Sequence, residues 1–375
     1  MKGSARTRFA PLAAGLVALC ALACGGSLPV PEPSSAEAAA RRDAALAAAR
    51  VWVPPAVPVG SADLGSNPAG DLPFQPDDEV ECRFVLREVG GTTPKFYCEL
   101  PGGEAVKIKY GRSNPELHAE VAASRLLAAL GFPADRMFVV RRVRCAGCPS
   151  FPFQALRCVQ RTGWERACLP RGIDERAIVD FDHAVLERRL PGREIVAYEG
   201  QGWGWYELER IDPARGGSPR AEVDALKLMA VVLAHWDNKP GNQRLICPAG
   251  EESADGVCAQ PLALVQDLGA TFGPLKLDLY NWRREPVWHD ASTCTVSMKH
   301  LPWGGGTFPD ARISEGGRRF LLDLLEQLSD AQLRDLFESS RITSHEQLSA
   351  EARDPGAWVR AFRSKVDQIR AAGPC

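Results

Sequence analysis

Apolar and polar residues alternate along several short stretches of the chain between residues 82 and 143. A period of two is typical of half-buried β-strands, and glycine-rich turns separate the first three stretches. Strands are therefore expected at 82–88, 95–100, 105–110 and 137–143. Between the third and fourth strands, apolar positions recur at helical spacing from a capping Asn114 to a terminating Gly131. This part of the chain predicts three antiparallel strands, a helix and a further strand.

The apolar pattern of the later part of the chain is mainly helical. Helices are expected at 221–235, 313–328, 330–341 and 355–372. A strand-like stretch at 262–267 follows the first of these helices, and Ser329 provides an N-cap for the third. The 375 residues suffice for one large or two medium domains with a buried core. The chain is therefore expected to be α+β, with strands first and helices last.

The first residues of the chain have the pattern of a secretory signal peptide. Basic residues precede an apolar run over 12–23 that is too short for a comfortable transmembrane helix. The ending A-L-A-C resembles a bacterial lipobox, which implies that Cys24 is the lipid-modified first residue of the mature chain. An ordinary cleaved signal with an incidental Cys24 is the alternative. We expect a signal peptide at 1–23 and an exported lipoprotein on the outer membrane, the periplasmic face of the inner membrane or the cell surface.

Residues 24–79 are rich in proline, alanine, glycine and serine, and the alanine-rich stretch at 36–50 is a candidate helix. A segment of this composition buries little apolar surface, so a flexible linker is expected between the lipid anchor and the folded part. The folded part is expected to begin near Val80, where the first strand pattern starts.

Twelve cysteines in one chain indicate an oxidising compartment. Those that follow Cys24 are Cys82, Cys98, Cys145, Cys148, Cys158, Cys168, Cys247, Cys258, Cys294 and Cys375. Their even number predicts a disulfide framework, in which Cys247 and Cys258 close a short hairpin. A four-cysteine zinc site built on the C-x₂-C pair of Cys145 and Cys148 is the alternative. Disulfides are favoured there, because the other two cysteines of the group lack the spacing of a second zinc-binding pair.

The charges of the chain almost cancel, since 45 Lys and Arg stand against 47 Asp and Glu. A general nucleic-acid binder would carry a strongly basic domain, so nucleic acid is not an expected partner. Lysine is scarce, with nine residues in the whole chain. Because arginine serves at most basic positions here, each lysine in a structured segment is a candidate for a specific role.

Three motifs occur along the chain in an informative order. The loop after the 221–235 helix reads H-W-D-N-K-P-G-N from His235 to Asn242, and it resembles the protein-kinase catalytic loop H-x-D-x-K-P-x-N. Asp267 begins a D-L-G triplet after the next strand, where kinases carry D-F-G. Lys109 ends a V-K-I-K stretch on the third strand, where they carry V-A-I-K.

The resemblance implies a role for the polar residues of the catalytic-like loop. Phosphoryl transfer depends on positioning and charge neutralisation more than on covalent help from the protein. Asp237 would accept or orient the proton of the attacking hydroxyl, and Lys239 would neutralise charge on the migrating phosphoryl group. Asn242 and Asp267 would supply oxygen ligands to Mg²⁺ or Mn²⁺, bound together with ATP or another nucleotide.

The resemblance also implies an ion pair at the nucleotide phosphates. Lys109 would hold the α- and β-phosphates, steadied by Glu120 of the following helix. Lys109 is preferred to Lys107 because of its place in the V-x-I-K pattern, and a solvated strand lysine is the alternative. Glu116 lies one turn earlier on nearly the same helix face and competes with Glu120. Glu120 is preferred because it heads the apolar run of the helix.

Gly90, Gly91 and Thr92 belong to the turn between the first two strands, where kinases have a phosphate-covering loop. Backbone N–H groups of this turn are the expected phosphate donors. The turn lacks the G-x-G-x-x-G spacing, so a plain hairpin turn is the alternative.

Two further likenesses point to an atypical kinase. The stretch D-L-G-A-T-F-G from Asp267 is similar to the D-x-G-x-x-F-G of secretory-pathway kinases, and the 114–131 helix is similar to helices of phosphatidylinositol 3/4-kinase-like proteins. The resemblance implies a bilobal kinase-like fold, with a small antiparallel-sheet N-lobe and one helix at 80–144. A cysteine-rich insert or hinge would occupy 145–202, and a mainly helical C-lobe 203–375. The absence of an A-P-E motif departs from typical protein kinases.

The predicted function is transfer of a nucleotide phosphoryl group to an unknown hydroxyl acceptor on a protein, lipid or small molecule. The complete set of motif residues supports this function, since a degenerate kinase is expected to have lost at least one of them. A catalytically inactive pseudokinase or scaffold is the alternative, because a bacterial periplasm or exterior holds little ATP. Nucleotidyl transfer on the same fold is a further alternative.

Overall fold

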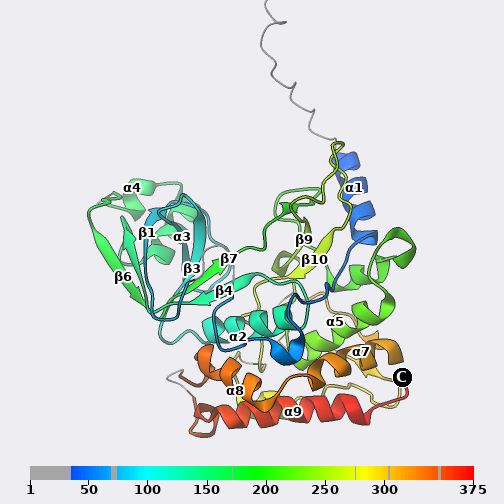
Figure 1. Ribbon diagram of the computed structural model, residues 1–375. Coiled ribbons are helices and arrows are strands. Elements are labelled where there is room, and N and C mark those ends of the chain that lie inside the picture. The colour runs from blue at the N-terminus through cyan, green and yellow to red at the C-terminus, as the bar shows by residue number, and fades with distance from the viewer. Residues whose placement is uncertain (1–34, 69–73, 171, 275, 303–304, 345–347) are drawn as a thin grey trace, which may run out of the picture.

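The computed structural model describes residues 35–68, 74–170, 172–274, 276–302, 305–344 and 348–375. The signal peptide and Cys24 predicted above lie outside these residues. The chain forms a strand-rich lobe and a helical lobe, and α2 (Pro115–Ala129) lies between them (Figure 1). The predicted α+β class with a sheet-rich and a helical part is confirmed. No helix among the described residues has both the length and the apolar character needed to span a membrane.

The strand-rich lobe is built on a seven-stranded sheet with the order β4-β7-β3-β2-β1-β5-β6. Its strands are β1 (Glu79–Val85), β2 (Lys95–Glu99), β3 (Ala105–Lys109), β4 (Arg136–Val139), β5 (Arg142–Ala146), β6 (Ile178–Asp182) and β7 (Val185–Arg188). Neighbouring strands are antiparallel except β1 and β5, which are parallel. The alternation seen in the sequence places Phe96 and Ile108 in an apolar cluster on one face. The opposite face of β2 and β3 is therefore left for polar residues.

The structure differs from the predicted hinge at 145–202, because most of this segment belongs to the strand-rich lobe. β6 pairs with β5, and β7 lies between β3 and β4. Two short helices, α3 (Pro152–Thr162) and α4 (Glu165–Cys168), precede these strands. β6 is an edge strand with one buried residue out of five, so its sequence carries little apolar alternation. This is why the sequence did not predict it.

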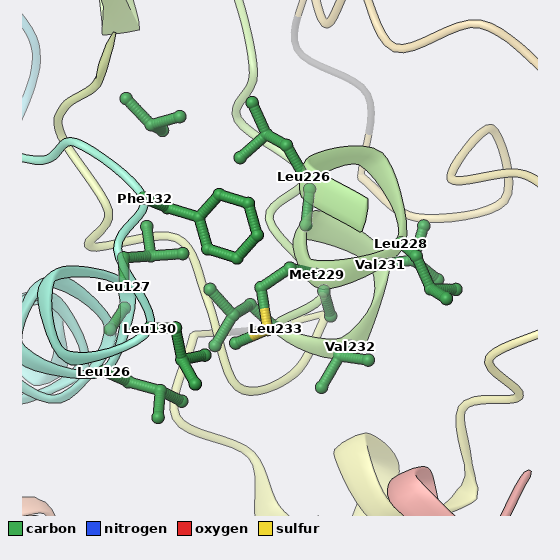
Figure 2. Close-up of a cluster of buried hydrophobic side chains, with 14 of the residues drawn as sticks. Leu126, Leu127, Leu130, Phe132, Leu226, Leu228, Met229, Val231, Val232 and Leu233 are labelled. Carbon is green, nitrogen blue, oxygen red and sulfur yellow. The ribbon is translucent and has the colours of Figure 1, made fainter. Parts of the chain in front are cut away.

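The helical lobe surrounds one large apolar core. Its helices are α5 (Arg220–Val232), α6 (Leu279–Arg284), α7 (Glu315–Glu326), α8 (Asp330–Ser339) and α9 (Pro355–Ala371). Its strands are β8 (Arg193–Glu194), β9 (Gln243–Cys247), β10 (Leu262–Val265), β11 (Thr295–Val296) and β12 (Ala311–Arg312). Figure 2 shows Leu127 of α2, with Leu130 and Phe132 just after this helix, beside Met229 of α5 and Leu233, which directly follows α5. The helix that belongs to the first lobe by sequence is thus packed into the core of the second.

The structure also differs from the predicted linker over 24–79. Residues Ser35–Ala47 form α1, which packs against the helical lobe (Figure 1). Leu46 and Val51 have no exposed area, and the guanidinium of Arg42 is buried as well. A segment rich in proline and alanine can fold in this way because its few apolar side chains join a core that the rest of the chain provides.

Disulfides join all ten cysteines found among the described residues. The pairs are Cys82–Cys98, Cys145–Cys148, Cys158–Cys168, Cys247–Cys258 and Cys294–Cys375. The predicted closure of a hairpin by Cys247 and Cys258 is confirmed. The zinc alternative is wrong, because Cys145 and Cys148 are bonded to each other and the other two cysteines of that group form a second bridge.

Candidate active site

The ammonium group of Lys109 lies among carboxylates at the end of β3. Its Nζ is 2.6 Å from each carboxylate oxygen of Glu120 and 3.2 Å from Oδ1 of Asp267. Glu120 reaches the strand because α2 begins where Asn114 caps it, accepting a hydrogen bond from the backbone N–H of Glu116. The structure therefore brings together three of the residues that the motifs predicted, from a strand, a helix and a loop.

Glu187 of β7 belongs to the same cluster, and the sequence analysis missed it. Its carboxylate contacts Nζ of Lys107, and its Oε2 lies 3.0 Å from Nζ of Lys109. The contact follows from the register, because Lys107 is directly opposite Glu187 and Lys109 lies two residues further along the same face. The sequence contains one sign of this residue, because a glutamate follows two apolar residues at 185–187, as in a short strand.

Burial and neighbouring charges shift the pKa values of this cluster in different directions. Burial lowers the pKa of Lys109, but the surrounding carboxylates outweigh this effect and raise it well above its ordinary value. Burial raises the pKa of Glu120 to about 7, because Lys109 offsets only part of the desolvation. Burial also disfavours the charge of Asp267, but the neighbouring lysines outweigh it and hold its pKa well below the usual range. Asp267 is therefore a fixed negative charge.

The catalytic-like loop connects α5 to β9. Nζ of Lys239 is 2.7 and 2.6 Å from the two carboxylate oxygens of Asp237. The side-chain amide of Asn242 donates to the backbone carbonyl of Asp237 at 2.5 Å. Asn238 anchors the loop from the other side, since its Oδ1 accepts the backbone N–H groups of residues 307–308 at 2.6 and 2.9 Å. The predicted polar residues of the loop thus hold one another in place.

β9 and β10 bring the loop and the D-L-G triplet to the same edge of their sheet. The strands are antiparallel, with Gln243 opposite Val265. The backbone N–H of Gln266 donates to the carbonyl of Asn242 at 2.9 Å. Asn242 directly precedes β9, and Asp267 follows β10 by two residues. The antiparallel register therefore places the two residues that the sequence predicts as metal ligands close together at this edge of the sheet.

The segment after D-L-G is held against α2 and the catalytic-like loop. A Cβ at Gly269 would lie 2.8 Å from the Cβ of Glu116, so the close approach of α2 requires glycine here. The carboxylate of Glu116 contacts Nζ of Lys276, and the indole N–H of Trp236 donates to the carbonyl of Gly273 at 3.2 Å. Glu116, the competing glutamate, therefore holds this segment, and Glu120 pairs with the strand lysine.

Gly90, Gly91 and Thr92 are exposed in the turn between β1 and β2. Gly91 has φ +69°, and a Cβ there would lie 3.3 Å from Nζ of Lys95. A Cβ at Gly90 would meet no other atom within 4 Å. The turn thus lies over a buried lysine, while Gly90 faces open space.

Comparisons with known proteins add little to this description. Neither a protein-family model nor a curated protein sequence matches the chain. Among solved structures, a Helicobacter pylori proinflammatory kinase, CtkA, is 10% identical with a TM-score of 0.41, over 78% of this chain and 95% of that one. A Golgi casein kinase with Mn/ADP bound is 13% identical with a TM-score of 0.34, over 78% of this chain and 72% of that one. The case for a kinase-like arrangement rests on the contacts described above.

Proposed function

We propose that this chain is a kinase-like phosphotransferase that moves a phosphoryl group from a nucleotide to a hydroxyl acceptor. The observation that carries the proposal is the contact of the buried Lys109 ammonium group with both oxygens of Glu120 and with the more exposed Asp267. A lysine held in this way is a fixed positive charge for phosphate, next to a fixed negative charge for a cation. An ion pair with a purely structural role would need only Lys109 and Glu120, and not the additional carboxylate of Asp267.

The residues of the catalytic-like loop suit transfer to a hydroxyl. The side chain of Asp237 is 26% exposed, so an acceptor can reach its carboxylate. As the acceptor oxygen bonds to the phosphorus and the nucleotide leaves, Asp237 takes the hydroxyl proton. Lys239 is 43% exposed beside it and places a positive charge where the phosphoryl group passes. Asn242 holds the backbone of Asp237 and so fixes the direction of its side chain.

The side chains present fit a hard divalent cation such as Mg²⁺ or Mn²⁺. Asn242 uses its amide N–H groups on the backbone of Asp237, which leaves its carbonyl oxygen for a ligand. Asp267 supplies a carboxylate whose low pKa keeps it charged. Oxygen donors of this kind are preferred by both ions. When bound, the cation would neutralise phosphate charge during transfer.

Nucleotide binding and label transfer by the full chain test this proposal. We expect calorimetry to show binding of ATP that depends on Mg²⁺ or Mn²⁺, and Asp267→Asn to weaken it by at least about 10-fold. Asp237→Asn is expected to retain ATP binding but to lower label transfer from γ-labelled ATP by at least about 100-fold. Asp367→Asn, at an exposed position of α9, serves as the matched control.

The outcomes separate the alternatives. No nucleotide binding by the wild-type chain would contradict the proposal and leave a scaffold role. Incorporation from α-labelled rather than γ-labelled ATP would show nucleotidyl transfer. Undiminished transfer by Asp237→Asn would show that this aspartate is not the residue that takes the proton.

We also propose that the protein is exported and anchored by lipid at Cys24. Support comes from the five disulfides among the described residues, since such bonds persist in oxidising compartments. Labelling cells with a radioactive fatty acid is expected to mark the wild-type protein and not Cys24→Ser. Equal labelling of both proteins would overturn the assignment of the anchor.

A further inference from the structure

Lys95 begins β2, the strand that follows the glycine turn. In the register of β2 and β3 it lies directly opposite Lys109, so both side chains emerge from the same face of the sheet. The residue is 7% exposed, and its Nζ lies beneath the turn close to Gly91. A third lysine therefore enters the site that contains Lys107 and Lys109.

Lys95 differs from the other two lysines in having no partner. Lys107 contacts Glu187, and Lys109 contacts both Glu187 and Glu120. Among the residues that the structure describes, Nζ of Lys95 forms no hydrogen bond and no ion pair. Burial lowers the pKa of Lys95, and the more distant Asp267 offsets part of this shift. The side chain of Lys95 is largely buried, and no protein group compensates the charge of its ammonium group, so this charge is available to an anionic ligand.

We propose that Lys95 binds a phosphate group of the nucleotide, on the side of the phosphates that faces the glycine turn. This inference rests on the phosphotransferase function proposed above. The ammonium group offers three N–H donors and a compact charge, which suit a phosphate oxygen. The turn that carries Gly91 would then cover the phosphates with Lys95 beneath it, while Lys109 holds them from β3.

A structural lysine and a ligand-binding lysine give opposite results when the charge is removed. Lys95→Met removes a partly desolvated charge that has no partner in the protein, so the melting temperature of the nucleotide-free chain is expected to stay unchanged or rise. Lys109→Met leaves Glu120 without its cation and removes one of the two lysines that contact Glu187, so it is expected to lower the melting temperature. Lys299→Met replaces an exposed lysine of the helical lobe and is the matched control.

Calorimetry with the full chain measures the nucleotide affinity of the same variants. We expect Lys95→Met to bind ATP and ADP about 10- to 100-fold more weakly in the presence of Mg²⁺, the loss typical of one charged hydrogen bond to phosphate. Adenosine has no phosphate, so its affinity is expected to be the same for Lys95→Met and the wild type. Lys95→Arg keeps the charge and is expected to retain more of the ADP affinity than Lys95→Met.

Each outcome decides a separate question. Equal ADP affinity of wild type and Lys95→Met would overturn the role of Lys95 while leaving the phosphotransferase proposal intact. A melting temperature of Lys95→Met as low as that of Lys109→Met, with adenosine affinity reduced as much as ADP affinity, would show a structural role and would also overturn it. Failure of the wild-type chain to bind any nucleotide would contradict the phosphotransferase function itself.

Discussion

His235, the first residue of the catalytic-like loop, has a buried imidazole whose pKa is lowered from its ordinary value to about 4. Burial is the main cause, and the nearby carboxylates of Asp237 and Asp267 offset part of it. Between pH 4 and 6.5 the unfolded chain therefore binds a proton at His235 that the folded chain does not bind. Stability is expected to fall by about 3 kcal/mol as the pH drops through this range because of His235 alone.

Urea denaturation of wild type and His235→Phe from pH 7.5 to 4.5 measures this contribution. About one pH unit above 6.5 the histidine is neutral in both states, so the difference between the two proteins is expected to become constant there. Below pH 6.5 the wild type is expected to lose stability faster than the variant. Parallel curves over the whole range would contradict the assignment, because other groups of the cluster titrate equally in both proteins.

At the scale of single residues, the sequence predicted the motif residues of the site but missed the glutamate that pairs with the lysines. The spacing of the motifs indicated Lys109, Asp237 and Asp267, because their order along the chain is what a kinase-like fold requires. It did not indicate Glu187, whose contact depends on β7 lying between two strands that precede it in the sequence. Pattern analysis reads local periodicity, and it has no access to such non-local pairing.

Among the elements, α2 is the one that joins the two lobes. The guanidinium of Arg125 in the middle of the helix contacts Oδ1 of Asn67 and donates to the hydroxyl of Ser339 at 2.9 Å. Nδ1 of His118 lies 3.1 Å from the carbonyl oxygen of Ser340, which follows α8. The segment before β1 and helix α8 thus hold α2 from two sides. The position of Glu120 on α2 is fixed by contacts outside its own lobe.

Asn67 is expected to be the most sensitive polar position of this anchor. Its amide donates to the carbonyls of Phe74 and Val139 at 2.7 Å, and its Oδ1 accepts the N–H of Val139 at 3.0 Å. Asn67→Ala leaves these backbone groups and the Nη2 group of Arg125 without their partner, while Nη1 of Arg125 keeps its hydrogen bond to Ser339. We expect a loss of about 3 kcal/mol in the free energy of unfolding, measured by urea denaturation.

Asn114→Ala provides the comparison within the same helix. Asn114 caps the N-terminus of α2 through one hydrogen bond to a backbone N–H, so its removal is expected to cost about 1 kcal/mol. An equal or smaller loss for Asn67→Ala than for Asn114→Ala would contradict the anchoring role of Asn67.

The elements that the sequence predicted are those with a strong period of their own. β1 alternates between exposed and buried residues, α2 begins at the capping Asn114, and α5 has apolar residues at helical spacing although nearly all of its residues are buried. The segment before β1 was predicted as a linker because a composition rich in proline, alanine, glycine and serine buries little apolar surface. It folds because Leu46 and Val51 enter a core made by other helices, and this depends on the tertiary structure rather than on local pattern.

On the scale of the whole molecule, the disulfides divide according to lobe. Three of the bridges among the described residues lie in the strand-rich lobe, at Cys82–Cys98, Cys145–Cys148 and Cys158–Cys168. The remaining two, Cys247–Cys258 and Cys294–Cys375, lie in the helical lobe. None of these bridges joins one lobe to the other, so the relative position of the lobes depends on noncovalent contacts, above all those of α2.

Cys294–Cys375 closes the longest loop, with a sequence separation of 81 against 10 for Cys158–Cys168. In the chain-entropy model, a longer loop constrains the unfolded chain more. We expect the double variant Cys294→Ser with Cys375→Ser to lose about 4 kcal/mol, and the double variant at Cys158 and Cys168 about 3 kcal/mol. Fluorescence of the buried tryptophans during urea denaturation reports the helical lobe.

Removal of a disulfide is expected to destabilise mainly the lobe that contains it, so the two lobes are followed separately. Because Cys294–Cys375 lies within the helical lobe, its removal is expected to shift the transition followed by Trp282 and Trp358, which are buried there. Removal of Cys158–Cys168 is expected to leave that transition in place and to weaken protection of backbone amides in the strand-rich lobe, measured by hydrogen exchange. A shift of both signals by either variant would show that α2 couples the lobes into one cooperative unit.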